Sequence, residues 1–160
     1  MVDSTDNAPT GILVAMLPAT DLAVSAAFYT QLLGLELRRE FVADGHVTGC
    51  SLSREDLPYA LNLRLRSTLP GDADLSGEHP VIWRVANEQA LDQFQAHAER
   101  LDLDPTSRRH DDAHLICVVD PDGHDVLVGY PVRPWTDFVG YELTTGGYHQ
   151  SHHRPRLQPA

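Results

Sequence analysis

The sequence is short of cysteine and of long apolar runs, and each shortage excludes a class of protein. It has 2 cysteines in 160 residues, too few for a disulfide scaffold. Because Cys50 and Cys117 both lie in apolar, strand-like runs, we expect buried free thiols. No stretch approaches the roughly 20 apolar residues of a membrane-spanning helix. Residues 1–10 lack the basic and apolar regions of a signal peptide, so we expect a cytoplasmic protein without a membrane partner.

Positive charge is also scarce, with 12 Lys and Arg against 23 Asp and Glu, for a formal net charge of -11. An acidic surface repels nucleic acid, which we therefore exclude as a partner. The acidity serves solubility, and it would also attract a cationic ligand. The apolar share of 42% is sufficient for a buried core.

Catalytic signatures are absent as well. The sequence has no glycine-rich phosphate loop and no His-Glu-x-x-His zinc motif. Neither Ser25 nor Ser51 lies in a nucleophile elbow, and neither cysteine has a context typical of a nucleophile. We therefore assign no catalytic residue from the sequence.

The first half of the sequence predicts a strand, a helix and three strands. A strand is expected over 12–17, followed by a helix whose N-cap is Thr20 or Asp21 and whose end is Gly34. Apolar residues recur at helical spacing between those limits. Three further apolar runs predict strands over 35–42, 47–52 and 59–65.

The second half repeats this order after a stretch rich in Pro, Gly and Asp. Phe28 and Leu35 have counterparts in Phe94 and Leu101, and Asn87 is the expected cap of the second helix. Such a repeat indicates duplication of one module. We expect a disordered lead over 1–10, a first βαβββ module over 11–66, a linker over 67–79, a second module over 80–131, and a partly mobile C-terminal extension over 132–160.

Two segments carry a resemblance to a known family. One runs from Leu17-Pro18-Ala19-Thr20-Asp21-Leu22 through Ala27-Phe28-Tyr29 to Leu32-Leu33-Gly34-Leu35, and the other is Asp120-Pro121-Asp122-Gly123-His124. Together they resemble the vicinal oxygen chelate superfamily of glyoxalases, extradiol dioxygenases and bleomycin-resistance proteins. The resemblance implies an α+β fold in which two tandem βαβββ modules form a curled, mixed eight-stranded sheet around a cavity. It also implies a homodimer, which the aromatic tail around Trp135 and Phe138 would support.

The resemblance implies four metal-ligand positions, which here hold Val14, Pro80, Leu127 and Asn62. A divalent ion needs several N, O or S donors around one point, and three of these side chains offer none. His79 lies next to Pro80, but a shift of one residue turns a strand side chain to the opposite face. We therefore expect no metal and no cofactor. A relocated metal site remains an alternative, with His46, His79, His110, His114 and His124 as its candidates.

Strand alternation predicts which side chains face the cavity. In the fourth strand Leu61 and Leu63 would face the helix, so Asn62 and Arg64 would face the cavity. Applied to every strand, the argument predicts these ligand-binding residues: Met16, Asn62, Arg64, Ile82, Arg84, His114 and Leu127. Arginine stacks on aromatic rings and forms paired bonds with carboxylates or phenolates.

Structural roles remain open for three of these residues. Arg64 and Arg84 could instead pair with acids such as Glu36 or Glu40. His114 could be a core histidine bonded to backbone.

An apolar floor with a few polar groups is typical of a site for an organic ligand. We therefore expect a metal-free small-molecule binding protein of the bleomycin-resistance type, which sequesters an antibiotic or another aromatic natural product. One alternative is a metal-independent isomerase, lyase or cyclase of natural-product metabolism. Another is a glyoxalase- or dioxygenase-like metalloenzyme with relocated ligands.

Overall fold

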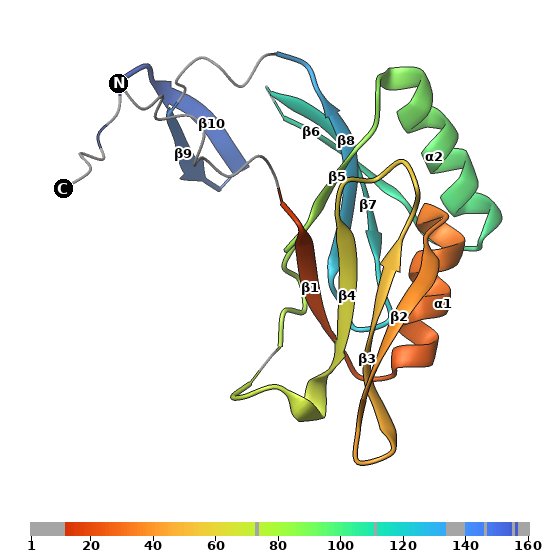
Figure 1. The fold of residues 1–160 in the computed structure, drawn as a ribbon. Helices are drawn as coiled ribbons and strands as arrows, with labels where there is room; N and C mark the ends of the chain where they lie inside the picture. Colours follow the sequence, from red (N-terminus) through yellow and green to blue (C-terminus); the bar gives the residue numbers. More distant parts are fainter. Residues whose placement is uncertain are drawn as a thin grey trace, which may run out of the picture. The chain divides into compact units, whose positions relative to one another are not determined.

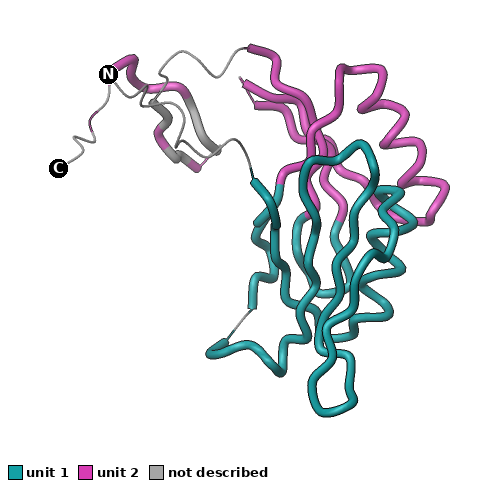
Figure 2. The backbone as a smooth tube through the Cα atoms, in the orientation of Figure 1, with its two compact units in different colours: residues 1–81, 119–125 teal, residues 82–118, 126–160 magenta. Residues whose placement is uncertain are grey.

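A computed structural model describes residues 12–72, 74–110, 112–133, 140–145, 147–154 and 156, and the chain divides into two compact units (Figures 1 and 2). Unit 1 comprises Met1–Val81 and Val119–Asp125, and unit 2 comprises Ile82–Val118 and Val126–Ala160. The predicted disordered lead and the aromatic residues Trp135 and Phe138 lie outside the described residues.

The described residues of unit 1 form one α-helix, one four-stranded sheet and one short 3-10 helix. Its elements are β1 (Val14–Ala19), α1 (Leu22–Leu33), β2 (Glu36–Ala43), β3 (His46–Ser53), β4 (Ala60–Leu65) and a short 3-10 helix, η1 (Arg66–Thr68). The strand order is β1-β4-β3-β2, with β1 parallel to β4 and the other pairs antiparallel. The predicted order of one strand, one helix and three strands is confirmed.

Helix α1 begins and ends where the sequence predicts. The Asp21 carboxylate accepts hydrogen bonds from the backbone amides of Ala23 (2.9 Å) and Val24 (3.1 Å), which decides between the two predicted caps. Gly34 ends the helix with a φ of 64°, a left-handed conformation that is costly for a residue with a Cβ atom.

The core of unit 1 lies between α1 and one face of the sheet. Helix α1 packs against β3 and β4 (Figure 1). Leu61 and Leu63 of β4 are each 1% exposed, as the predicted alternation requires. Burial of one such side chain contributes roughly 1.5–3 kcal/mol. The sheet therefore has one buried face and one face left for other contacts.

Unit 2 repeats the same order of elements. These are β5 (Ile82–Arg84), α2 (Glu88–Arg100), β6 (Thr106–Arg109), β7 (Ala113–Val119) and β8 (Asp125–Pro131), in the sheet order β5-β8-β7-β6. Asn87 caps α2 by accepting a hydrogen bond from the Ala90 amide (3.0 Å), as predicted. The parallel pair β5 and β8 corresponds to β1 and β4 of unit 1.

The fold class predicted from the sequence is confirmed as α+β with two βαβββ modules. The eight strands lie in two sheets of four, however, and in the described residues no strand pairing joins these into one continuous sheet. A further antiparallel hairpin, β9 (Gly140–Thr144) and β10 (Gly147–His152), lies in the stretch predicted to be partly mobile. Strand-forming residues on both sides of a short glycine-containing turn are typical of a hairpin.

Both cysteines are buried and neither forms a disulfide bond, as predicted. Within the described part of the chain, no helix is long and apolar enough to cross a membrane.

Candidate functional site

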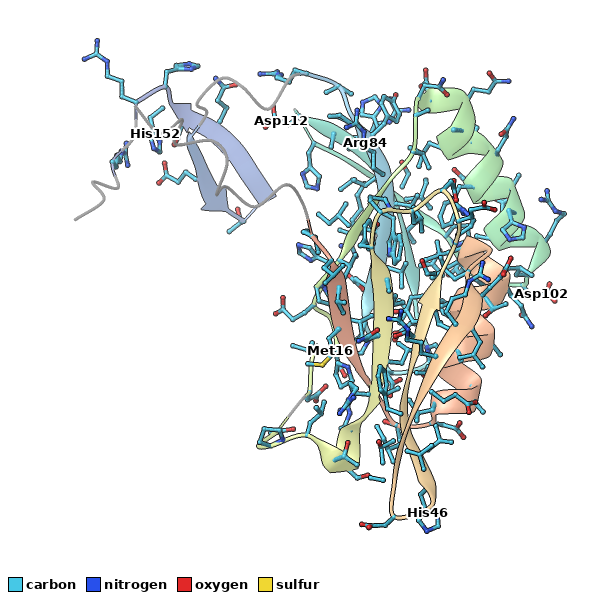
Figure 3. All side chains as sticks on the ribbon, in the orientation of Figure 1. Met16, His46, Arg84, Asp102, Asp112 and His152 are labelled. Atoms are coloured by element: carbon cyan, nitrogen blue, oxygen red, sulfur yellow. The ribbon has the colours of Figure 1, made fainter. Side chains whose placement is uncertain are left out.

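On the face of the unit 1 sheet opposite α1, side chains lie in rows that run across the strands. Some of these residues were predicted to bind the ligand, and others were not. In one row, Met16 of β1 pairs with Asn62 of β4, which pairs with Ser51 of β3. Ser51 in turn pairs with Arg39 of β2. Met16 is labelled on β1 in Figure 3. We call this face, made of the following residues, the open face: Val14, Met16, Arg39, Phe41, Gly49, Ser51, Asn62 and Arg64.

The next row of the open face is formed by Arg64, Gly49 and Phe41. The Arg64 guanidinium lies over the Phe41 ring, with its carbon 5.2 Å from the ring centroid. A Cβ atom on Gly49 would come within 2.9 Å of Arg64 Cδ and 2.8 Å of the Leu63 carbonyl oxygen. Gly49 therefore makes room for Arg64 to cross toward Phe41.

The partner of Arg64 is thus an aromatic ring rather than a predicted acid. Glu36 instead pairs with Arg38 at 2.8 Å. No ion pair joins Arg64 to an acid among the residues that the structure describes.

A pocket of about 740 Å³ adjoins one end of the open face. The open face contributes Val14, Arg39, Phe41, Ser51 and Asn62 to its lining. The other walls are Leu13, Arg38 and residues of the loop between β3 and β4. Pockets of about 300–1,000 Å³ are typical for drug-sized organic ligands.

The loop between β3 and β4 is held in place by Arg54. Its Nη1 donates to the Leu33 carbonyl at the end of α1 (2.8 Å), and its guanidinium forms a paired contact with Asp56. The hydrogen bond raises the pKa of Arg54 and lowers the pKa of Asp56. The Ser53 hydroxyl donates to the Tyr59 carbonyl at 3.2 Å. These bonds fix the loop as a wall of the pocket.

The floor of the pocket contains one oriented polar pair. The Ser51 hydroxyl donates to Oδ1 of Asn62 at 2.5 Å. This bond turns the amide so that its NH₂ group remains available as a donor.

A second polar cluster lies at the predicted Asp-Pro-Asp-Gly turn, where unit 1 buries Asp120. The Asp120 carboxylate accepts from the Tyr29 hydroxyl (2.8 Å), from His124 Nδ1 (2.9 Å) and from the backbone amides of Asp122 (2.9 Å) and His124 (2.8 Å). Tyr29 and His124 are each 1% exposed. Burial, followed by the neighbouring Asp120 carboxylate, raises the pKa of Tyr29.

Asp122 extends this cluster to the start of α1. Its carboxylate accepts from the Thr20 amide (2.8 Å) and the Ser25 hydroxyl (2.9 Å). Burial alone would raise the pKa of Asp122, but these hydrogen bonds outweigh it and lower the pKa. The Asp-Pro-Asp-Gly turn therefore holds the N-terminal end of α1 in place. The sequence pattern did not predict this role.

The remaining predicted ligand-binding residues lie in unit 2. Ile82 and Arg84 of β5 are exposed, and Arg84 is labelled on that strand in Figure 3. Leu127, the register partner of Ile82, is 3% exposed and packs with Leu115 and Cys117. The structure thus gathers Met16, Asn62 and Arg64 on one sheet and places the other predicted residues in the second unit.

His114 of β7 forms a side-chain pair with Tyr130 of β8. His114 Nδ1 lies 2.9 Å from the Tyr130 hydroxyl, and the two rings meet edge to face. The polar partner of the His114 ring is therefore the Tyr130 side chain, whereas the alternative prediction named the backbone. Burial is the largest of the effects that raise the pKa of Tyr130.

The residues at the implied metal-ligand positions do not fit a metal ion. Val14, Pro80 and Leu127 have no side-chain donor, and the Asn62 oxygen already accepts from Ser51. In the described ranges, no group of three or more His, Cys, Asp or Glu could hold a metal ion. The side chains at these positions therefore do not support a metal-dependent reaction.

A family model described as "Glyoxalase/Bleomycin resistance protein/Dioxygenase superfamily" matches residues 11–128. A lactoylglutathione lyase from Agrobacterium tumefaciens is similar in structure, at 21% identity and a TM-score of 0.63, over 77% of this chain and 95% of that chain. TnmS3, an antibiotic binding protein from Streptomyces sp. CB03234, is similar in structure at 16% identity and a TM-score of 0.62, over 78% of this chain and 98% of that chain.

A member of the same superfamily from Sphaerobacter thermophilus matches at 14% identity with a TM-score of 0.64, over 76% of this chain and 98% of that chain. A search of curated proteins gave no match. At these identities the solved structures establish a shared fold.

Proposed function

Because the chain belongs to the glyoxalase/bleomycin resistance protein/dioxygenase superfamily, we propose that it is a binding protein that sequesters a small aromatic natural product. An antibiotic is the example that the fold suggests, since TnmS3 is described as an antibiotic binding protein. The ligand is held reversibly, without a metal ion and without chemical change.

The observation that carries this proposal is the composition of the unit 1 pocket. Its volume suits an organic molecule, and its lining combines apolar side chains, among them Leu13, Val14, Phe41 and Leu57, with a comparable share of polar and charged ones. Apolar contact supplies part of the affinity, at roughly 25 cal/mol per Å² buried before ordering costs, and the polar groups orient the ligand. The positions that would hold a catalytic metal carry Val14 and Asn62 in this unit.

The partner proposed from the resemblance is a second copy of the chain, giving a cytoplasmic homodimer with two equivalent ligand sites. Native mass spectrometry measures the mass of this homodimer together with that of the bound ligand.

Arg64 stacks on Phe41 beside the pocket lining, and we expect the ligand to extend onto it, so Arg64→Ala should weaken ligand binding by about 1–3 kcal/mol. The sequence predicts a loss of the same size for Arg84→Ala, but Arg84 lies in unit 2 and does not line this pocket, so that prediction is tested separately. Isothermal titration with the ligand recovered from a panel of aromatic natural products, bleomycin included, measures both. Unchanged affinity together with a lower thermal midpoint would show that these arginines are structural.

The pair formed by His114 and Tyr130 favours one second candidate, a metal-independent isomerase, lyase or cyclase. A histidine bonded to a phenol at 2.9 Å can hold and move a proton. Recovery of a chemically altered ligand would favour this candidate over sequestration. A stoichiometric metal found by elemental analysis of the purified protein would favour the metalloenzyme alternative instead.

A further inference from the structure

We propose that the unit 1 pocket selects an organic anion, a planar aromatic ring bearing a carboxylate, sulfonate or phenolate group. This inference rests on the proposed function and adds the charge of the ligand and the residues that recognise it. The acid group would bind at Arg39 and Asn62, and the ring would lie against Phe41 and Arg64.

The balance of charge at the pocket favours an anionic ligand. The chain as a whole has a net charge of -11, yet the charged lining residues are three arginines and one acid, Glu55. Two of these arginines are neutralised, Arg38 by Glu36 and Arg54 by Asp56. The third, Arg39, has no ion pair with an acid in the part of the chain that the structure describes.

The uncharged polar groups of the pocket floor present a hydrogen-bond donor to the ligand. Because the Ser51 hydroxyl donates to Asn62 Oδ1, the Asn62 NH₂ group remains to bind a ligand. Within the described ranges, that NH₂ group donates no hydrogen bond. Arg39 likewise offers only donors, because a guanidinium has no acceptor. The floor of the pocket is thus matched to a ligand rich in acceptors.

The spacing of these groups suits one acid group attached to a planar ring. Asn62, Ser51 and Arg39 are register neighbours on three adjacent strands. Since neighbouring strands lie about 4.8 Å apart, the backbones of Arg39 and Asn62 are roughly 10 Å apart. The two side chains can therefore reach the same acid group from opposite sides. Arg64 and Phe41 occupy the adjoining row and stack with each other. A planar ring extends that stack, and the Arg39 fork matches a flat oxyanion.

The acidity of the whole chain does not oppose this selection at contact distance. Coulomb energy falls with distance, and salt screens exposed charges beyond about 8 Å at physiological ionic strength. The donors in the pocket therefore decide the sign of the bound charge. A cationic ligand, which the overall composition would attract, would find a single carboxylate there.

Two fluorescent dyes that differ in one group test this proposal on the full chain. 8-Anilinonaphthalene-1-sulfonate and N-phenyl-1-naphthylamine share their ring system, and only the first has a sulfonate. We expect the sulfonate dye to bind about tenfold more tightly, the scale of one charge-assisted hydrogen bond. Arg39→Gln should abolish this preference, because it weakens binding of the sulfonate dye much more than binding of the neutral dye.

Arg100→Gln is the matched control, because it changes the net charge equally on α2 of unit 2, where the side chain is exposed. It should keep the preference, and circular dichroism should show both variants folded. Equal affinity of the wild-type protein for the two dyes would overturn the anion proposal and leave the proposed function standing. Equal weakening of both dyes by Arg39→Gln would also overturn it. If neither dye binds, the pocket itself fails, and the proposed function fails with it.

Discussion

Replacing Asp120 by alanine should lower the free energy of unfolding by about 3–5 kcal/mol, the scale for removing one partner of a buried, hydrogen-bonded charge. The substitution would leave the Tyr29 hydroxyl, His124 Nδ1 and two backbone amides without their acceptor. Total stabilities of about 5–15 kcal/mol make this a large share. Urea denaturation followed by circular dichroism measures the loss.

Two further variants keep that prediction testable if Asp120→Ala does not fold. Tyr29→Phe removes a single donor from Asp120 and should cost about 1 kcal/mol. Asp72→Ala removes an exposed loop carboxylate of the same unit and should change stability by less than about 0.5 kcal/mol. Equal effects of the three substitutions would contradict the assignment of Asp120 as the centre of the turn.

Leu63→Ala should cost about 2–5 kcal/mol, because Leu63 is 1% exposed and its loss leaves a cavity beneath the sheet. Arg64→Ala, at the next position, should cost less than about 1 kcal/mol, since it removes one partly exposed stacking contact. The pair of variants measures which face of β4 is buried. Similar losses for both would mean that Arg64 is a structural residue and that the open face is misassigned.

The local elements of unit 1 were predictable because their signals lie close together in the sequence. Asp21, the apolar spacing and Gly34 define α1 within one short segment. The alternation of Leu61, Asn62, Leu63 and Arg64 assigned the two faces of β4 for the same reason. These predictions needed no knowledge of the tertiary fold.

The rest of the open face was not predictable from alternation. Strand β2 has no regular apolar pattern, and its pairing with β3 shifts register between Leu37 and Arg39 and between Phe41 and Val42. Alternation fails across such bulges. Arg39 and Phe41 were therefore missed, although Gly49 in the middle of a strand is a recognisable sign of close approach.

The buried cluster at the turn was missed for a different reason. Tyr29 and Asp120 are far apart in the sequence and meet only in the folded unit. A tyrosine on the buried face of an apolar helix was the available signal, because its hydroxyl requires a partner. In β8 all of Val126, Leu127 and Val128 are buried, so alternation had no polar residue by which to choose a face. Contact of Leu127 with the ligand stays a prediction.

Native mass spectrometry tests the central claim most directly. The full chain is incubated with aromatic natural products, bleomycin included, and the bound complex is weighed. The ligand is then released with solvent and weighed again. We predict a homodimer that carries two ligands, released with unchanged mass. A released compound of altered mass, or a protein that retains none of the compounds, would contradict sequestration as the function.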